Sequence, residues 1–261
     1  MVGKVGKGMP EWFTYAKARA SFAQVGNDMD AYQLYNTYSI GSDPNGNTTA
    51  GQGKTKYDAD VRSELITSWE AGAELKFFNN RLGVDFAWYK TNAKRQLMNI
   101  PLNNLSGYDN MKVNAGNIQN TGIEIMLNAR PIETAQFSWD TQLNFSQNKS
   151  KIIELLPGKP GMQYALGGSD ALQVYAVAGG AYGEIWGTKY QRVEEGEFKG
   201  QLLLNESGLP QATSDKHKIG EQQPDFLLGW TNTFNYKNFT LSFLIDGRFG
   251  GCLLYTSPSP R

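Results

Sequence analysis

The sequence contains very little cysteine and histidine, which excludes several kinds of site. Cys252 and His217 are the only residues of their types among 261. One of each cannot form a disulfide, a Cys/His metal cluster or a Cys-x-x-Cys redox pair. No metal and no cofactor are therefore expected, and the redox state of the compartment stays open.

Long apolar runs are also missing. No segment approaches the roughly 18 consecutive apolar residues that a transmembrane helix requires, so a helical membrane protein is excluded. The first residues, MVGKVGKGMPEWF, lack the apolar central segment of a secretion signal. Two explanations are open: the protein stays inside the cell, or Met1 is not the natural start.

Net charge is absent as well. The 25 acidic and 25 basic residues balance, and no basic patch is interleaved with aromatics, so nucleic acid is not an expected partner. The mean hydropathy is −0.48. Such a polar average is compatible with a β-barrel, because barrel strands hide their apolar face in alternation.

The stretch WEAGAELKFFNNRLGVDFAWYK, residues 69–90, alternates clearly between apolar and polar residues. Successive side chains of a strand point to opposite faces, so the period of two predicts strands at 69–77 and 82–88. Asn79 and Asn80 between them tolerate the positive φ of a hairpin turn. Each run is about ten residues long, and a tilted strand needs roughly 9–11 to cross a bilayer. The hairpin is long enough to span a membrane.

The same alternation recurs along the chain. It predicts a strand at 12–24 and two further hairpins, 123–129 with 137–145 and 228–236 with 239–248, with weaker strand signals at 185–193 and 198–204 around the turn EEGE. Short turns and connections of about twenty residues or more follow each other in regular alternation along the chain. Outer-membrane barrels show the same alternation, with short periplasmic turns and long extracellular loops. Aromatics near the strand ends resemble interfacial girdles.

A different fold could show the same alternation. In a large soluble β-sandwich, such as a carbohydrate-binding domain, the apolar side chains would face a second sheet. Sandwiches usually have short turns at both ends. The regular alternation of short turns with long connections, together with the strand length, therefore favours the barrel. The soluble carbohydrate-binding module remains the alternative.

Several segments resemble a known family. AKARASFAQVGND, SWEAGAELKFFNNRLGVDFAWYKTNAK, SGYDNMKVNAGNIQNTGIEIMLNARPI, FSWDTQLNFSQNKSKI and YKNFTLSFLIDGRFGG are similar, in this order, to segments of the SusC/RagA-like TonB-dependent transporters of Bacteroidota outer membranes. The resemblance extends from about Trp12 to Gly251. It implies an all-β fold: about eight to ten strands of a larger, about 22-stranded antiparallel transmembrane barrel.

The resemblance also implies a function and partners. It implies an outer-membrane importer of nutrients such as glycans or oligopeptides, without covalent chemistry, that works with a SusD-like surface lipoprotein, the TonB complex and the lipid of the outer membrane. The family's signal peptide, plug and TonB-contacting segment do not match any part of this sequence. Residues 1–251 are therefore expected to be an interior barrel fragment. The final CLLYTSPSPR, residues 252–261, leaves the family pattern and is expected to be foreign, because its prolines cannot donate to a strand ladder.

No pattern supports catalysis or metal binding. DPNGN, residues 43–47, resembles the start of a calcium loop, but its glycine stands fourth and Lys54 occupies the twelfth place, so an Asx turn is the better interpretation. GGSDA, residues 167–171, is not the G-x-S-x-G of a nucleophile elbow. No catalytic residue is proposed.

Two sets of residues are candidates for contact with a substrate. Loop tyrosines offer a flat apolar face with a polar tip for sugar rings or peptide side chains. For each of them, packing within loops or against the lipoprotein is the simpler role. These tyrosines are Tyr32, Tyr35, Tyr38, Tyr108, Tyr164 and Tyr175. The polar side of the strands would line a lumen or contact a plug; it carries Glu70, Glu74, Lys76, Asp85, Glu124, Asp140, Asn144, Asp246 and Arg248.

Overall fold

The computed structural model describes residues 10–28, 35, 37–58, 60–168 and 172–251, and strands dominate these ranges. Tyr32 and the tail 252–261 lie outside the described residues. The elements are β1 (Phe13–Asn27), β2 (Tyr38–Ser42), β3 (Thr48–Gln52), β4 (Thr55–Tyr57), β5 (Glu64–Phe77), β6 (Leu82–Pro101), η1 (Asn104–Ser106), β7 (Asn110–Glu133), β8 (Phe137–Glu154), β9 (Gln163–Gly168), β10 (Leu172–Val177), β11 (Tyr182–Gly187), β12 (His217–Glu221), β13 (Phe226–Tyr236) and β14 (Phe239–Phe249). None of the described helical residues forms a helix long and apolar enough to cross a membrane.

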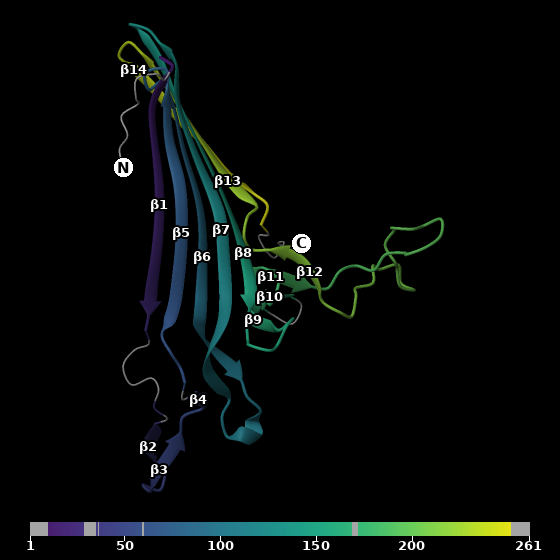
Figure 1. Cartoon of the computed structure of the whole chain (residues 1–261). Coiled ribbons are helices and arrows are strands. Elements are labelled where there is room, and N and C mark those ends of the chain that lie inside the picture. Colours follow the sequence, from purple (N-terminus) through teal and green to yellow (C-terminus); the bar gives the residue numbers. More distant parts are fainter. Residues whose placement is uncertain (1–9, 29–34, 36, 59, 169–171, 252–261) are drawn as a thin grey trace.

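One long antiparallel sheet organises the molecule. Its strand order is β1-β5-β6-β7-β8-β13-β14, and the short β4 adds a parallel pair with β7. The seven long strands run side by side as a tall, open sheet (Figure 1). Strands neighbouring in sequence are mostly neighbours in space, as in an up-and-down barrel. The sheet is thus part of a barrel wall, as the sequence predicted.

The strand register separates apolar from polar side chains. One row across five strands contains Ala73, Phe86, Ile125, Phe145 and Leu228. Paired residues of neighbouring strands share a face, so this row lies wholly on one side of the sheet. The next row lies on the other side and contains Lys17, Glu74, Asp85, Met126, Asn144, Gly229 and Asp246.

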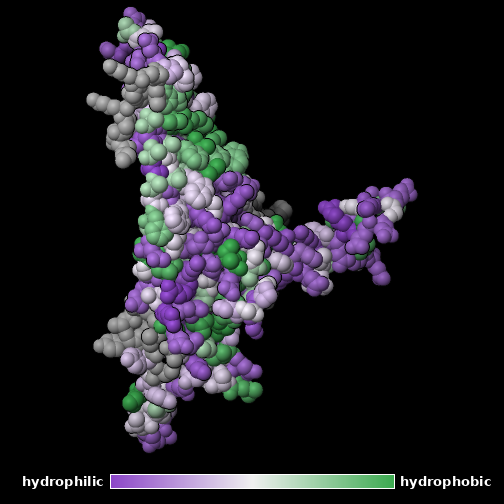
Figure 2. Space-filling view, in the orientation of Figure 1, coloured by the Kyte–Doolittle hydropathy of each residue, from purple (hydrophilic) through white to green (hydrophobic). Residues whose placement is uncertain are grey.

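The apolar face forms a belt that no other described strand covers. Trp69 is 54% exposed and Leu241 is 63% exposed, although both belong to the regular sheet. In Figure 2 green side chains gather over the half of the sheet near the short turns, and purple side chains dominate towards the other end. A soluble monomer rarely exposes an apolar surface of this kind without a partner.

The short turns all lie at one end of the long sheet. They join β5 to β6, β7 to β8 and β13 to β14 (Figure 1). Asn79 and Asn80 have φ of 55° and 67°, which confirms the predicted hairpin, and Lys237 has φ of 51° in the third turn. Asparagine accepts this left-handed backbone more readily than most residues.

A second, four-stranded sheet packs near the opposite end. Its order is β12-β11-β10-β9, and the turn before β11 is fixed to β8 by two backbone bonds: Ile152 donates to Gly180 and Gly179 donates to Ile152, at 2.9 and 2.8 Å. Ile152, Leu155 and Ala176 form the buried core there, with Met98 and Ile118 against them. Ile118 and Ile152 are paired on the polar side of the long sheet. The second sheet therefore covers that side of the wall and leaves the apolar belt free.

The strands extend further than the sequence indicated. β6 continues to Pro101, β7 begins at Asn110 and β8 continues to Glu154, where loops were expected. Beyond the apolar belt the outer face becomes polar, so the regular alternation disappears while strand pairing continues. The first long connection also contains the β2–β3 hairpin and β4. The weaker signals at 185–193 and 198–204 correspond to β11 and to a ribbon with isolated bridges such as Arg192 with Leu202.

A bend divides the long β6–β7 hairpin. Arg95 and Gly116 would face each other in the register, and both have left-handed backbone, with φ of 58° and 82°. The Asn114 side chain fixes this position: it donates to the carbonyls of Arg62 and Arg95 at 2.7 and 2.9 Å and accepts from the Arg62 amide. A left-handed arginine is strained, and these three bonds offset part of that strain.

Candidate functional site

The nine polar strand residues predicted from the sequence share one face of the long sheet. Glu70, Glu74 and Lys76 lie on β5, with the other six on β6, β7, β8 or β14 at positions that the register joins to them. The charged side chains of this part of the wall are thus concentrated opposite the apolar belt.

Four of these residues line a hollow of about 680 Å³ on the polar face: Asp85, Glu124, Asn144 and Asp246. Arg19 joins them from β1. Its guanidinium donates to both carboxylate oxygens of Asp85, at 2.9 and 2.6 Å, and lies 3.7 Å from Glu70. This two-pronged geometry is the strong form of an arginine–carboxylate pair. Arg19 reaches Asp85 across β5, where Gly72 provides the space, because a Cβ there would lie 2.7 Å from the Arg19 Nε.

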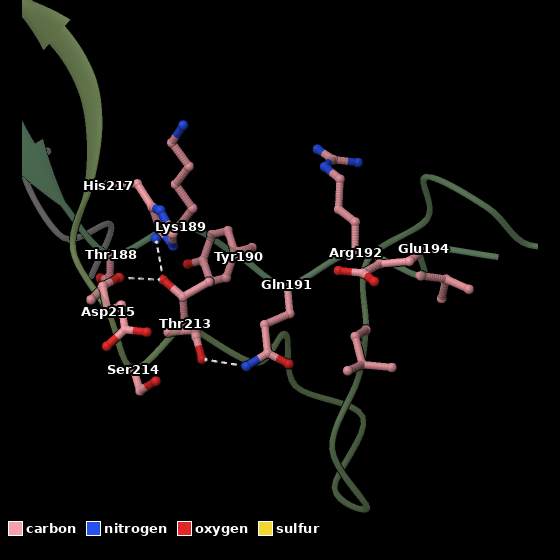
Figure 3. Close-up of a pocket in the computed structure, with 13 residues that line it drawn as sticks. Thr188, Lys189, Tyr190, Gln191, Arg192, Glu194, Thr213, Ser214, Asp215 and His217 are labelled. Carbon is pink, nitrogen blue, oxygen red and sulfur yellow. Dashed lines mark hydrogen bonds between the residues drawn. The ribbon is translucent and has the colours of Figure 1, made fainter.

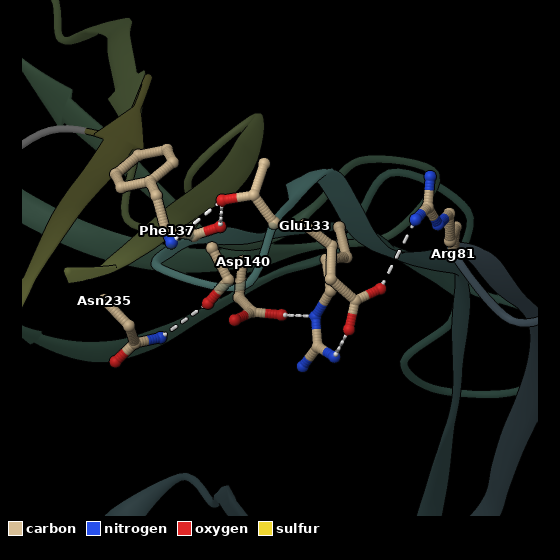
Figure 4. A network of polar contacts seen from close by, with 8 residues as sticks. Arg81, Glu133, Phe137, Asp140 and Asn235 are labelled. Carbon is tan, nitrogen blue, oxygen red and sulfur yellow. Dashed lines mark hydrogen bonds and ion pairs between the residues drawn. The ribbon is translucent and has the colours of Figure 1, made fainter. Parts of the chain in front are cut away.

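The end of the polar face near the short turns carries a second ionic network (Figure 4). Arg130 donates to Asp140 at 2.6 Å and to Glu133 at 3.1 Å, and Arg81 lies 3.5 Å from the other oxygen of Glu133. The network joins the β5–β6 turn to the β7–β8 turn. Asp140, which the sequence predicted to line the lumen, therefore forms an ion pair with Arg130 and helps to hold the two hairpins together.

The other end of the polar face holds a cavity of about 640 Å³ between the long sheet and the second sheet. Its apolar wall includes Met98, Ile118, Leu155 and Ala176. Its polar lining consists of uncharged side chains and one cation: Gln96, Asn99, Asn120, Ser150, Tyr164, Tyr182, Gln223 and Lys112. Lys112 lies over the Tyr57 ring at 6.0 Å. The lining contains no carboxylate, so nothing in it favours a cation, and the cavity suits a ligand with apolar and hydrogen-bonding parts.

The second sheet is held in shape by a buried carboxylate. The Glu184 side chain is 6% exposed and accepts from Lys218 Nζ, the Ala181 amide and the Trp186 indole at 2.9, 3.1 and 3.0 Å. Burial raises the pKa of Glu184, but these donors outweigh it and hold the pKa below its ordinary value. Lys218 also pairs with Glu221. The arrangement holds β11 against β12 beside the cavity.

The structure separates the tyrosines that the sequence singled out. Tyr35 and Tyr38 are 69% and 65% exposed near the β2–β3 hairpin, while Tyr108 is half-buried in the β6–β7 connection. Tyr164 and Tyr175 lie on the adjacent β9 and β10, but the register places them on opposite faces of the second sheet. Of the described tyrosines in this set, Tyr164 lines the 640 Å³ cavity.

The sequence did not indicate Gln96, Met98, Tyr182 or Gln223 as members of a site. They come from β6, from β11 and from the segment before β13, and only the folded second sheet brings them to one cavity. In the sequence, Met98 was the one apolar residue of these four, and a single apolar residue in a segment without regular alternation does not indicate a site.

A larger hollow of about 1290 Å³ lies at the base of the ribbon that runs from β11 to β12 (Figure 3). Lys189 and Arg192 extend to the same side of the ribbon, and Gln191 donates to the Ala212 carbonyl at 3.1 Å. Thr213 accepts from the Lys189 amide and donates to the Asp215 carbonyl. These bonds stabilise the ribbon itself, and its polar groups do not converge on one point.

The DPNGN segment forms an Asx turn, as expected. Asp43 accepts from the amides of Asn45 and Asn47 at 2.9 and 2.8 Å and from the Asn47 side chain. Those donors hold the pKa of Asp43 below its ordinary value, with the Asn47 side chain as the largest cause. Across the part of the chain that the structure describes, no cluster of three or more potential metal ligands occurs.

Comparison with known proteins agrees with this geometry. The family described as "TonB dependent receptor-like, beta-barrel" matches residues 10–246. TonB-dependent receptor P3 of Formosa agariphila is 28% identical over 261 residues, covering 91% of this chain and 26% of that protein. TonB-dependent receptor SusC of Bacteroides thetaiotaomicron is 28% identical over 247 residues, covering 88% and 24%.

A solved structure shares the fold. The RagAB peptide importer in the "open-open" state superposes with a TM-score of 0.74 at 16% identity, covering 94% of this chain and 27% of that one. The chain spans about a quarter of the length of the curated relatives that it matches. From the match over 237 residues and the sheet described above, the chain belongs to the TonB dependent receptor-like β-barrel family, as its SusC/RagA-like segments predicted.

Proposed function

We propose that this chain forms part of the barrel wall of an outer-membrane nutrient importer that depends on TonB. The observation that carries the proposal is the separation of the two sheet faces. From Trp69 to Phe77 the apolar face of β5 has no charged residue, while Glu70, Glu74 and Lys76 lie on the other face. Those nine residues span roughly 27 Å at about 3.3 Å per residue, close to the apolar band of about 25 Å of membrane barrels.

The connections give the proposed orientation. The short turns would lie in the periplasm and the long connections outside the cell, as is usual for such barrels. The 640 Å³ cavity then opens near the extracellular end of the lumen, and a substrate would meet it before it reaches the charged hollow around Asp85 and Arg19. No covalent step is needed for such transport.

The substrate proposed from the cavity is a neutral glycan or oligopeptide. Apart from Lys112, the polar lining is uncharged, and this supports the choice, because carboxamides and hydroxyls can pair with sugar hydroxyls or with peptide groups. The relative in the comparison structure is described as a peptide importer. We propose a surface lipoprotein and the TonB complex as partners, on the model of the family's transporters.

Tryptophan fluorescence tests the lipid contact directly. Trp69, Trp88, Trp139 and Trp230 lie on the apolar face, whereas Trp186 lies in the second sheet beyond the belt. The intact protein should be reconstituted in vesicles of phosphatidylcholine with brominated acyl chains, since bromine quenches fluorescence at short range. We expect strong quenching of a variant that retains Trp88 alone and little quenching of one that retains Trp186 alone.

The alternative, a soluble carbohydrate-binding module, gives a different result. Such a protein would remain in solution without detergent, and bromolipids would leave Trp88 and Trp186 equally bright. A Phe86→Arg substitution adds a second test. At mid-membrane it should lower the free energy of unfolding in micelles by roughly 2–4 kcal/mol, whereas Asn144→Arg on the polar face should have a much smaller effect.

A further inference from the structure

The charges on the apolar side of the wall are distributed unevenly. Among the described residues of the seven long strands, the basic side chains on this face are Lys90 and Lys94 of β6 and Lys149 and Lys151 of β8. All four lie beyond the apolar belt, towards the long connections. Glu154, paired with Asn117 at the far end of β8, is the acidic residue of this face within the same strands.

Three of these lysines lie close together in the register. Lys90 pairs with Thr121, and Thr121 pairs with Lys149, so one row across three strands reads Lys, Thr, Lys. Neighbouring strands are about 4.8 Å apart, and Lys151 follows Lys149 by one repeat of about 6.6 Å. We call Lys90, Thr121, Lys149 and Lys151 the lysine patch. Its backbone positions fit within about 12 Å.

The lysine patch has polar groups without partners in the protein. Within the described residues, none of its three ammonium groups makes an ion pair or hydrogen bond, and the Thr121 hydroxyl is also free. The amides next to the patch are already paired: Asn92 donates to Asn117 at 3.1 Å, and Gln119 donates to Asn92 at 3.3 Å. Glu184, Glu221 and Asp225 share a hollow with Lys149 and Lys151 at the edge of β8, and the first two bind Lys218.

The position of the patch relative to the belt indicates its ligand. Lys90 follows Trp88, the last apolar residue on this face of β6 before the bend at Arg95, by two residues, or about 6.6 Å. Lys149 follows Phe145 of β8 by four residues. If the belt lies in hydrocarbon, as proposed above, the patch lies at the level of the lipid headgroups. Long lysine stems can keep their charge there while their methylenes lie along the apolar edge.

From this geometry we infer that the lysine patch binds the phosphate groups of anionic lipids in the outer leaflet. A phosphate accepts from several ammonium groups and from a hydroxyl at once, which matches the row of Lys90, Thr121 and Lys149. The inference rests on the proposed membrane location. It adds a specific lipid contact, on the outer side of the wall, to a protein whose substrate would pass on the inner side.

Lipid retention tests this inference. The intact protein is placed in nanodiscs of phosphatidylcholine with a minor fraction of phosphatidic acid, whose headgroup is a phosphate monoester, and the lipids that it retains are counted by native mass spectrometry. We expect the retained phosphatidic acid to exceed its bulk fraction by about fivefold or more, since each lysine near an anionic surface contributes about fivefold in partitioning.

Two variants with equal charge change identify the source of the effect. Replacing Lys90→Gln, Lys149→Gln and Lys151→Gln together should return retention to the bulk ratio, and the matching change to arginine should preserve enrichment. The control Lys189→Gln, Lys199→Gln and Lys216→Gln removes three lysines from the ribbon and should leave enrichment unchanged.

The outcomes separate this inference from the proposed function. Insertion into nanodiscs without preference for phosphatidic acid, or an equal loss in the ribbon control, would overturn the lysine patch while leaving the membrane location intact. Failure of the intact protein to insert at all would reject the proposed function and this inference with it.

Discussion

Tyr89 of β6 lies over Gly122 of β7. The two residues are paired in the register, and the tyrosine hydroxyl continues beyond the glycine to donate to Asn148 of β8 at 3.3 Å. A Cβ at Gly122 would overlap the Tyr89 ring and would lie 2.6 Å from the Gln147 carbonyl oxygen. One side chain thus joins three strands because the middle strand has no side chain at that point.

A methyl group at this position should therefore destabilise the sheet. We expect Gly122→Ala to lower the free energy of unfolding by about 1–3 kcal/mol, the range for overpacking a filled site. Urea unfolding in detergent micelles measures the change. Gly83→Ala is the control on the same face, because its Cβ would meet Asn128 at an ordinary 3.9 Å. Equal effects of the two substitutions would contradict this explanation.

The Arg19–Asp85 pair should contribute measurably although it is partly solvated. Both side chains are about a third exposed, at 35% and 34%, so we expect Asp85→Asn to lower the free energy of unfolding by only about 1 kcal/mol. Asp109→Asn breaks the more exposed pair with Lys54 and should change it by less than about 0.5 kcal/mol. A larger effect at Asp109 than at Asp85 would show that the two-pronged geometry adds nothing.

The second sheet should lose stability at both extremes of pH. The lowered pKa of Glu184 means that its contribution is present above the ordinary glutamate pKa, about 4.3, and is lost as the pH falls through the lower, folded value. Burial lowers the pKa of Lys218, but its bonds to Glu221 and Glu184 raise it overall. The stabilisation by Lys218 is present below the ordinary lysine pKa, about 10.4, and is lost as the pH rises through the higher pKa that Lys218 has in the folded protein.

Hydrogen exchange in β10–β12 measures this dependence. Glu184→Gln should remove the acid-dependent loss of protection and reduce protection at neutral pH, because an amide cannot replace the charged acceptor for Lys218. Glu194→Gln, on the exposed ribbon, should leave the profile unchanged. The explanation fails if the protection of the Glu184 variant still depends on acid as in the unaltered protein.

Loss of the Asn114 side chain should loosen the bend. We expect Asn114→Ala to lower the free energy of unfolding by about 1–3 kcal/mol, because it leaves backbone groups of Arg62 and Arg95 without partners. Hydrogen exchange should rise at residues 60–63. Asn99→Ala, at an exposed position of the same hairpin, should change neither the free energy of unfolding nor the hydrogen exchange at residues 60–63. Similar exchange in the two variants would argue against the role of Asn114.

The belt could be predicted from the sequence because each of its strands has one apolar face and one polar face. Phe86 is apolar and its neighbour Asp85 is charged, and this contrast predicts both that the segment is a strand and which face each side chain occupies. Asn79 and Asn80 then fix the turn. The apolar and polar faces of the three hairpins followed from these local signals alone.

The half of the structure towards the long connections could not be predicted in the same way. Asn92 and Gln119 place polar side chains on the face that is apolar in the belt, so the regular alternation ends there even though the ladder continues through them. The cavity around Tyr164 depends on backbone bonds between Ile152 and the turn at Gly179 and Gly180, far away in the sequence. A left-handed Arg95 had no local signal, since arginine does not favour that conformation.

The facing pair of Arg95 and Gly116 makes the long hairpin two segments joined end to end. On one side of the pair the strands continue to the apolar belt and the short turns; on the other side β7 pairs with the short β4, and the two strands end in the β6–β7 connection. We expect changes beyond the pair to disturb the belt less than changes within it. The bend is accordingly a natural boundary for a chimeric receptor: a segment grafted between these two residues would replace the part of the cavity lining that includes Gln96, Met98 and Lys112 and would leave the apolar belt unchanged.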